Sequence, residues 1–277
     1  MPLSDGPGPR INATFSVRDG VLTILDRPVF GGSQDELLDQ FEVLAKSAKP
    51  SLVVTLNVDQ TLRLQDDAGF AQAVREAELV VIDGTPISWL GELLGAADYR
   101  RNTGADLLPA ASRRSWNLAI AGGRQGIVEA AAKSLSGNRA TVSAVAFPMI
   151  ESIGDPAGEG VVHALAEHEP SVVFLCLGAP KQELWYRHWR EMLPPAVYVG
   201  AGAAVDFAAG RVRRAPRLVQ LLGLEWLFRV AQEPRRLAAR YVVRGPQFIG
   251  VIVRSLWAAF RGDPDARGST EGRSNGA

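Results

Sequence analysis

Short apolar runs rich in β-branched residues recur along this chain, and each is followed by a loop or a stretch with helical character. The runs read SLVVTLN, ELVVID, WNLAIAGG, ATVSAVAF, SVVFLCLG and AVYVGAG, and the helix-like stretches lie at 66–77, 86–94, 125–136, 158–168 and 181–192. Strands that are apolar throughout and separated by helices are typical of a parallel sheet covered on both faces. The sequence therefore predicts an α/β fold with a mainly parallel, Rossmann-like sheet.

The length and composition suit a folded core with flexible ends. The chain has 277 residues, of which 47% are hydrophobic and 22% are charged, as in globular proteins. We expect a flexible N-terminus over 1–12, an α/β core over 13–210, a helical basic appendage over 211–261 and a disordered tail over 262–277. Because no apolar leader and no run of 18 apolar residues is present, a cytoplasmic location is expected.

Charge is unevenly distributed, although the formal net charge is zero. Residues 1–210 hold 17 basic and 25 acidic side chains, whereas residues 211–277 hold 13 basic side chains, all arginine, and 5 acidic ones. Arginines beside aromatic residues on short amphipathic helices suit the interface of an anionic membrane. A helical cap on the sheet with solvated arginines is the alternative. About three short helices are predicted here, interrupted at Pro216, Pro234, Gly245 and Pro246.

Polar residues stand at the ends of two early strands. Asp83 ends the run VVID, where a carboxylate loses part of its hydration and is suited to act as a general base. The same residue is also suited to cap the helix that starts near Pro86. Thr55 and Asn57 end the preceding strand, and two-residue alternation puts both side chains on one face. They either enter the same crevice as Asp83 or serve as ordinary turn residues.

Two glycine-containing turns follow later strands. AGGRQG at 121–126 precedes a helix, whose first N–H groups are able to hold phosphate. Its spacing lacks the G-x-G-x-x-G fingerprint, which argues against a nicotinamide-dependent oxidoreductase and favours a tight strand-to-helix turn. In LGAPKQE at 177–183, Gly178 and Pro180 fix a turn. Three polar side chains follow in the first helical turn, where a cap needs only one: Lys181, Gln182 and Glu183.

Metal-binding and hydrolase motifs are missing from the sequence. The histidines at 163, 168 and 188 show no H-E-x-x-H spacing and Cys176 is the single cysteine, so no metal site is expected. The one D-x-D string, at 263–265, falls in the expected tail. No G-x-S-x-G elbow occurs, which argues against a serine hydrolase.

Longer segments occur in a fixed order: TLNVDQ, VVIDGTPI, RRNTGADLL, AIAGG, LGAPKQE, VGAGAAVDFAAG, RAP and LEWLFRVAQEPRR. In this order and spacing they resemble the WecG/TagA/CpsF family of bacterial glycosyltransferases, from about residue 20 to residue 250. The resemblance implies that Asp83 is the catalytic base. The other residues implied for the catalytic site are Thr55, Asn57, Arg101 and Gln182. Basic positions implied to reach a lipid diphosphate are Arg229, Arg235, Arg236 and Arg240.

The resemblance implies an inverting, metal-independent transferase that moves a hexosyl group, N-acetylmannosaminyl or related, from a UDP-sugar to a polyprenyl-diphosphate-linked sugar. The implied setting is cell-envelope polysaccharide or glycolipid synthesis, with the protein bound peripherally at the inner face of the cell membrane. No cofactor and no nucleic acid are expected, whereas a homo-oligomer is possible. Strand-end and nearby positions expected to bind substrate are Gly84, Gly122, Gly123, Gly178, Lys181, Glu183, Gly200 and Asp206. The alternative is a membrane-docked sugar-nucleotide sensor without turnover, which has no need of a base such as Asp83.

Overall fold

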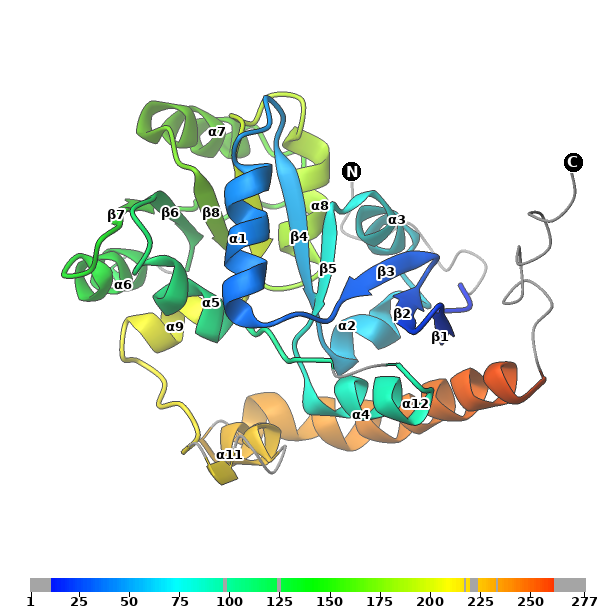
Figure 1. The fold of residues 1–277 in the computed structure, drawn as a ribbon. Helices are drawn as coiled ribbons and strands as arrows, with labels where there is room; N and C mark the ends of the chain where they lie inside the picture. Colours follow the sequence, from blue (N-terminus) through cyan, green and yellow to red (C-terminus); the bar gives the residue numbers. More distant parts are fainter. Residues whose placement is uncertain are drawn as a thin grey trace, which may run out of the picture.

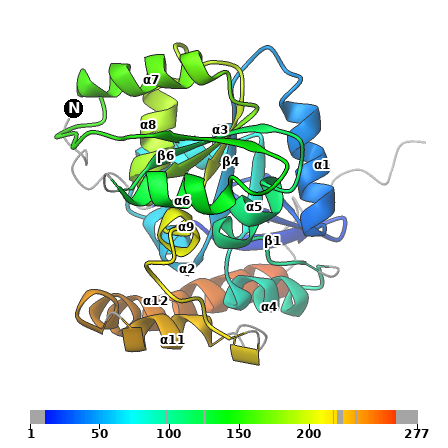
Figure 2. The same ribbon diagram turned by 90° about the vertical axis from the view of Figure 1, so that its left-hand side faces the viewer.

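The computed structural model describes residues 11–96, 99–123, 126–216, 218–219, 224–232 and 234–261, with side chains at these positions except 226, 229 and 234–244. The described residues form a nine-stranded sheet with helices on both of its faces (Figures 1 and 2). This arrangement confirms the α/β class and the mainly parallel Rossmann-like sheet that the apolar runs predict.

The nine strands of the described sheet lie in the order β1-β2-β3-β5-β4-β9-β8-β6-β7. Their bounds are β1 Phe15–Arg18, β2 Val21–Ile24, β3 Arg27–Phe30, β4 Ser51–Leu56, β5 Leu79–Ile82, β6 Asn117–Gly122, β7 Thr141–Val145, β8 Val172–Cys176 and β9 Val197–Gly200. β1, β2 and β3 form an antiparallel meander, and the pairings from β3 to β7 are parallel. The sequence does not predict this meander, because its four-residue strands contain Arg, Ser and Thr.

The middle strands are buried on both faces, which accounts for their continuous apolar runs. Every residue of β4, β8 and β9 is buried. Alternate side chains of one strand enter two separate hydrophobic clusters, so that Val54 and Leu56 pack on one face and Val53 packs on the other. Helices therefore have to cover both faces of the sheet.

The helices divide between these two faces. α1 (Gln34–Leu44), α5 (Gly104–Ala111), α6 (Ile127–Leu135) and α9 (Ala204–Ala208) place buried side chains in the cluster that contains Val53. α2 (Val58–Arg63), α3 (Ala68–Glu76), α4 (Thr85–Leu93), α7 (Ala157–His168) and α8 (Lys181–Trp189) do so in the cluster of Val54. The predicted stretches correspond to α3, α4, α6, α7 and α8, whereas α1, α2 and α5 have no predicted counterpart.

Two further helices whose bounds the structure describes follow the core. α11 spans Glu225–Gln232 and α12 spans Pro234–Arg261. The expected break at Pro234 coincides with the start of α12, but the expected interruption at Gly245 and Pro246 is wrong, because α12 continues through both residues. A proline inside a helix costs about 3 kcal/mol. The packing of the residues that follow Pro246 offsets this cost.

α12 joins the core through its second half. Phe248 and Val251 are buried in the cluster that contains Val54. The buried hydroxyl of Ser255 accepts a hydrogen bond from the Phe15 N–H of β1 at 2.9 Å. The C-terminal helix thus packs on the sheet as part of the same hydrophobic core.

The last helices lie beyond the carboxyl ends of the parallel strands. In both views α12 runs alongside α4 on that side of the molecule, with α11 next to it (Figures 1 and 2). Across the described residues, none of the helices is long and apolar enough to span a bilayer. The carboxyl ends of the strands therefore face a helical layer formed by α4, α11 and α12.

Candidate active site

The carboxyl ends of five neighbouring parallel strands form one edge of the sheet, which we call the carboxyl edge. The register aligns Leu56 of β4 with Ile82 of β5, and Leu175 of β8 with Gly200 of β9. The chain leaves β8 for α8 on one face, whereas it leaves β6 for α6 on the other. Ligands of open α/β sheets bind at carboxyl ends where neighbouring connections diverge in this way. The candidate site is therefore expected along this edge.

Asp83 is the first residue after β5 and is half-buried at the carboxyl edge. Its N–H donates to the Leu56 carbonyl of β4 at 2.8 Å, so its backbone is fixed between the two strands. The N-cap of α4 is Gly84, not Asp83, so the expected alternative of Asp83 in the N-cap position is wrong. A Cβ added to Gly84 would lie 4.0 Å from the Asn57 Cα, which places the ends of β4 and β5 in contact.

Thr55 and Asn57 both make hydrogen bonds within the protein. The buried Thr55 hydroxyl donates to the Gly200 carbonyl at 2.5 Å and so joins the ends of β4 and β9. Asn57 is the N-cap of α2, where its side-chain oxygen accepts the Gln60 N–H at 3.1 Å and the Gln60 side chain accepts the Asn57 N–H at 2.8 Å. Such reciprocal capping stabilises the start of a helix. The two side chains thus fix the end of β4, whose Leu56 carbonyl accepts the Asp83 N–H.

Gln182 and Glu183 form a closed buried pair at the start of α8. The side-chain oxygen of Gln182 accepts the N–H of Gly178 at 3.2 Å and the N–H of Gly202 at 3.1 Å. Its side-chain nitrogen donates to Oε1 of Glu183 at 2.8 Å. Gln182 is 1% exposed and Glu183 is fully buried. Gln182 therefore ties the loop after β8 to the loop after β9.

Burial sets the protonation of Glu183. Removal from water raises the pKa of its carboxyl to about 7, against the opposing effect of the hydrogen bond from Gln182. Among the described residues, the second oxygen of Glu183 has no hydrogen-bond partner. A Cβ added to Gly200 would lie 2.6 Å from Nε2 of Gln182 and 2.9 Å from Oε1 of Glu183, so only glycine fits there. The pair therefore packs directly against the backbone of Gly200 at the end of β9.

The turn after β6 also requires glycine. Gly122 has φ +118°, and a Cβ there would lie 2.8 Å from the Cys176 carbonyl carbon of the neighbouring strand. Gly123 and Gly178 both adopt positive φ angles in their loops. The N-cap of α6 is Gly126, whose N–H donates to the Glu129 side chain at 2.6 Å. A carboxylate therefore already occupies part of this helix N-terminus, where the sequence suggests phosphate.

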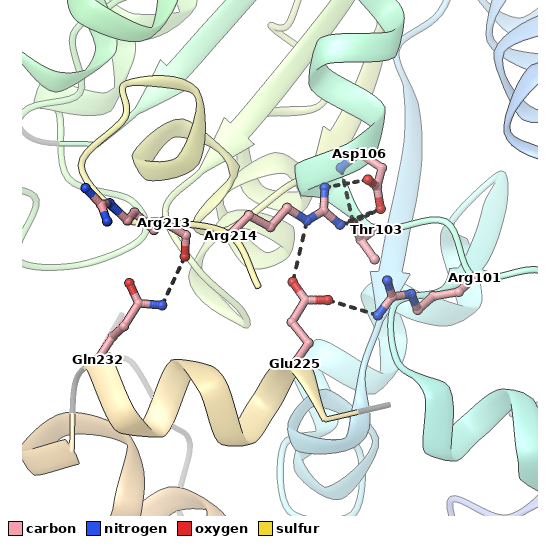
Figure 3. Close-up of polar contacts among 7 residues, drawn as sticks. All are labelled: Arg101, Thr103, Asp106, Arg213, Arg214, Glu225 and Gln232. Atoms are coloured by element: carbon pink, nitrogen blue, oxygen red, sulfur yellow. Dashed lines mark hydrogen bonds and ion pairs between the residues drawn. The ribbon is translucent and has the colours of Figure 1, made fainter. Parts of the chain in front are cut away.

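A group of charged and polar side chains joins the core to the start of α11, and we call it the arginine cluster. Its members are Arg101, Thr103, Asp106, Arg214 and Glu225 (Figure 3). Arg214 holds Asp106 with two guanidinium nitrogens, one of them at 2.6 Å, and Thr103 donates to the same carboxylate at 2.7 Å. Nη1 of Arg101 donates to Oε2 of Glu225 at 3.0 Å, and Nε of Arg214 lies 3.6 Å from Oε1 of Glu225.

Neighbouring elements position this cluster. Asn102 donates its N–H to the Ile82 carbonyl at 2.9 Å, which holds the backbone that follows Arg101 at the end of β5. Thr103 is the N-cap of α5 and fixes Asp106 in its first turn. On the C-terminal side, Gln232 donates to the Arg213 carbonyl at 3.0 Å, so both ends of α11 are attached to the segment before it or to the core (Figure 3).

The charges of the cluster stabilise one another. Burial opposes ionisation of Asp106, but hydrogen bonds from Arg214 and Thr103 outweigh it and hold the pKa of Asp106 below its ordinary value. Burial on its own would lower the pKa of Arg214. The negative charges of Asp106, Glu225 and Asp83 outweigh this effect, so the pKa of Arg214 lies above its ordinary value. The candidate base Asp83 thus lies within electrostatic reach of the Arg214 guanidinium.

The other expected site residues lie at the start of α8, in α9 or outside the described side chains. Lys181 is half-buried at the start of α8, and Asp206 in α9 pairs with Arg211 at 3.2 Å. Within the described ranges, no three His, Cys, Asp or Glu side chains gather as a metal site would require. The expected diphosphate contacts lie outside the described side chains: Arg229, Arg235, Arg236 and Arg240.

Four of the five residues of the cluster were not among the expected site residues: Thr103, Asp106, Arg214 and Glu225. Arg214 opens the segment R-A-P and Glu225 stands in L-E-W, both within segments that carry the resemblance. Their pairing with Arg101 and Asp106 spans more than a hundred residues of sequence, which no local pattern reveals. In the sequence, the signal for Arg214 and Glu225 is that both belong to the ordered segments that carry the family resemblance.

The model of the family described as glycosyl transferase WecG/TagA/CpsF matches residues 22–262. The chain belongs to the WecG/TagA/CpsF family of glycosyltransferases. The match runs from β2 through α12, so it includes the carboxyl edge, the arginine cluster and both C-terminal helices. As a member of this family, the protein transfers a sugar from a sugar-nucleotide donor to an acceptor.

Proposed function

We propose that the protein is an inverting glycosyltransferase that moves a hexosyl group, N-acetylmannosaminyl or related, from a UDP-sugar to a polyprenyl-diphosphate-linked sugar. The reaction needs no metal ion and serves cell-envelope polysaccharide or glycolipid synthesis. The observation that carries this proposal is the half-buried Asp83 at the carboxyl edge. Its charge acts on the Arg214 guanidinium, and the strand that it ends accepts the backbone N–H that follows Arg101. A base next to cations is what an inverting displacement from a diphosphate leaving group requires.

In the proposed reaction, the acceptor hydroxyl attacks C1 of the donor sugar from the face opposite to UDP. Asp83 takes the hydroxyl proton as the new C–O bond forms, and the bond between C1 and the diphosphate oxygen breaks with its electron pair on UDP. The leaving diphosphate gains negative charge, which Arg101 and Arg214 stabilise by charge-assisted hydrogen bonds. Arg101 keeps the catalytic role that the resemblance implies, and Arg214 joins it.

The remaining candidates act mainly through the backbone. The polar side-chain atoms of Thr55, Asn57 and Gln182 form hydrogen bonds with the backbone of strand ends and loops. We therefore propose that these residues position the carboxyl edge, where Asp83 lies. The buried Glu183 supports Gln182. Thr55 and Gln182 hold the strand end and loops at Gly178, Gly200 and Gly202. We propose that these positions, together with the turns at Gly84, Gly122 and Gly123, contact the substrate.

The helical layer below the carboxyl edge supports contact with a lipid-linked acceptor. Trp89 and Leu93 of α4 are 55% and 64% exposed, and α12, which lies beside α4, exposes Trp257 and Phe260 (Figure 2). Arg261 stacks on Trp257, with its guanidinium carbon 4.4 Å from the ring centroid. Exposed aromatic residues with arginine suit the headgroup region of an anionic membrane. We propose peripheral attachment of this layer to the inner face of the cell membrane.

The proposal is tested by UDP release from a panel of UDP-hexoses, with and without a polyprenyl-diphosphate-linked sugar in detergent, in buffer containing EDTA. The expected result is release that depends on the acceptor, persists in EDTA and occurs with one donor or a few related donors. Absence of release from every pair by folded protein that binds UDP would contradict the proposal and favour a sugar-nucleotide sensor. Release that is lost in EDTA would contradict metal independence alone.

A further inference from the structure

Glu225 lies between Arg101 and Arg214, and its carboxylate forms a hydrogen bond with only the first of these two guanidinium groups. Oε2 accepts a hydrogen bond from Arg101 at 3.0 Å, but Oε1 lies 3.6 Å from Nε of Arg214, beyond hydrogen-bond length. Nε of Arg214 is buried and, among the described residues, has no hydrogen-bond partner. The other side of the same guanidinium is held by two bonds to Asp106. Arg214 is thus fixed on one side and unsatisfied on the side that faces Glu225.

A buried N–H group without an acceptor is costly in a protein, and a larger anion relieves that cost. A diphosphate carries more oxygens and more negative charge than one carboxylate, so it is able to contact Arg101 and the Nε of Arg214 together. The side chains of Arg101, Arg214 and Glu225 retain 21%, 24% and 17% of their exposure to solvent, so this site is open to exchange. A carboxylate in such a place competes with diphosphate.

We propose that Glu225 is an internal latch, whose carboxylate holds the anion site between Arg101 and Arg214 until the diphosphate of a substrate displaces it. This inference rests on the proposed function, because it concerns the site where that reaction releases UDP. Glu225 is the first residue of α11, while Gln232 at the other end of α11 stays bonded to the Arg213 carbonyl. Displacement of Glu225 therefore frees the first turn of α11 and leaves its last turn attached.

The test measures binding of inorganic pyrophosphate by calorimetry to the wild-type protein and to Glu225→Gln. The variant keeps the shape of the side chain and removes its competing charge, so we expect pyrophosphate to bind about 5- to 30-fold more tightly. Glu191→Gln is the matched control, because Glu191 pairs with Arg190 on an exposed part of the surface, and its affinity should equal that of the wild type. Equal or weaker binding by folded Glu225→Gln would overturn the latch.

The wild-type protein gives a second readout that does not depend on the variant folding. Pyrophosphate should speed amide hydrogen exchange at the start of α11, near 225–228, while exchange near Gln232 stays slow. Protection of the start of α11 by pyrophosphate would contradict displacement of Glu225. Parallel titrations with UDP and with a short prenyl diphosphate in detergent show which source of diphosphate gains affinity when the carboxylate is removed.

Failure of the latch and failure of the proposed function are distinguishable. Sugar transfer with unchanged pyrophosphate affinity in Glu225→Gln would retain the transferase and remove the latch. Tighter pyrophosphate binding in the variant, without transfer from any UDP-hexose, would retain the latch and remove the proposed donor and acceptor. The pyrophosphate titration therefore reports on Glu225 independently of turnover.

Discussion

The Gln182–Glu183 pair and the arginine cluster both lie at the carboxyl edge, and they use their polar atoms in opposite ways. Gln182 and Glu183 are 1% and 0% exposed, and Gln182 satisfies two backbone N–H groups and its neighbour. Arg101, Arg214 and Glu225 keep about a fifth of their exposure, and one of their contacts is too long for a hydrogen bond. Each group leaves one buried polar atom without a partner among the described residues, Oε2 of Glu183 and Nε of Arg214. The pair is closed to solvent and stabilises the fold, whereas the partly exposed cluster is able to exchange with ligand.

The largest expected effect of breaking the closed pair is on stability. Gln182→Leu leaves the N–H groups of Gly178 and Gly202 without their acceptor and removes the donor to Glu183. At about 1–3 kcal/mol for each of these three groups left without a partner, the free energy of unfolding should fall by roughly 3–9 kcal/mol. Urea unfolding monitored by circular dichroism measures this loss.

Gln72→Leu is the matched control for this substitution. Gln72 donates to Glu76 within α3 and is half-buried, so its replacement should change the unfolding free energy by less than about 1 kcal/mol. A Gln182→Leu protein of wild-type stability that had lost turnover would contradict the comparison. Gln182 would then touch substrate rather than hold the loops.

The next effect concerns pH and the buried carboxyl of Glu183. Because burial raises its pKa from 4.5 to about 7, the native protein binds this proton more tightly than the unfolded chain does. The resulting stability is fully present below pH 4.5 and is lost as pH rises through about 7. A shift of this size corresponds to roughly 3 kcal/mol. Glu183→Gln, which mimics the protonated acid, should therefore gain about that much relative to the wild type between pH 4.5 and pH 8.

Urea unfolding of both proteins at several pH values measures this gain. Glu191→Gln provides the control, since Glu191 is exposed, and its stability difference from the wild type should vary little with pH. A constant difference between Glu183→Gln and the wild type across the same range would mean that Glu183 titrates normally. The pair would then be less closed than its burial indicates.

The smallest expected effect concerns ligand affinity in the open cluster. Arg214→Lys keeps the charge but loses the planar two-point contact with Asp106 and the Nε that faces Glu225. Pyrophosphate should bind about 10-fold more weakly, which equals about 1.4 kcal/mol. Calorimetry measures this change, with Arg187→Lys as the control because Arg187 makes its ion pair with Glu76 on α3. Equal affinity of Arg214→Lys and wild type would remove Arg214 from the anion site.

The sequence predicts the parallel strands well because burial on both faces requires continuous apolar runs, as in β4 and β8. It also locates polar residues at the right strand ends, including Asp83. It does not predict the antiparallel meander, whose strands are short and partly polar, nor the continuity of α12 through Pro246, which depends on the tertiary packing of Phe248 and Val251.

The roles of individual site residues were harder to predict than their positions. The partner of Gln182 at Gly202 lies 20 residues away, and the partner of Arg101 at Glu225 lies 124 residues away. Local spacing carries no information on contacts of this kind. Only the assembled carboxyl edge shows that Gln182 binds the loops after β8 and β9 and that Arg214 pairs with Asp106.

The central claim, that Asp83 is the base for sugar transfer beside the arginine cluster, is tested most directly by comparing Asp83→Asn with the wild type in the acceptor-dependent UDP-release assay. A positioned general base contributes about 10²- to 10⁴-fold, so turnover should fall by that factor while UDP affinity changes little. Asp39 lies on α1 and forms an exposed ion pair with Arg114. Asp39→Asn, which alters this pair, should retain wild-type turnover. Wild-type turnover by Asp83→Asn would contradict the account.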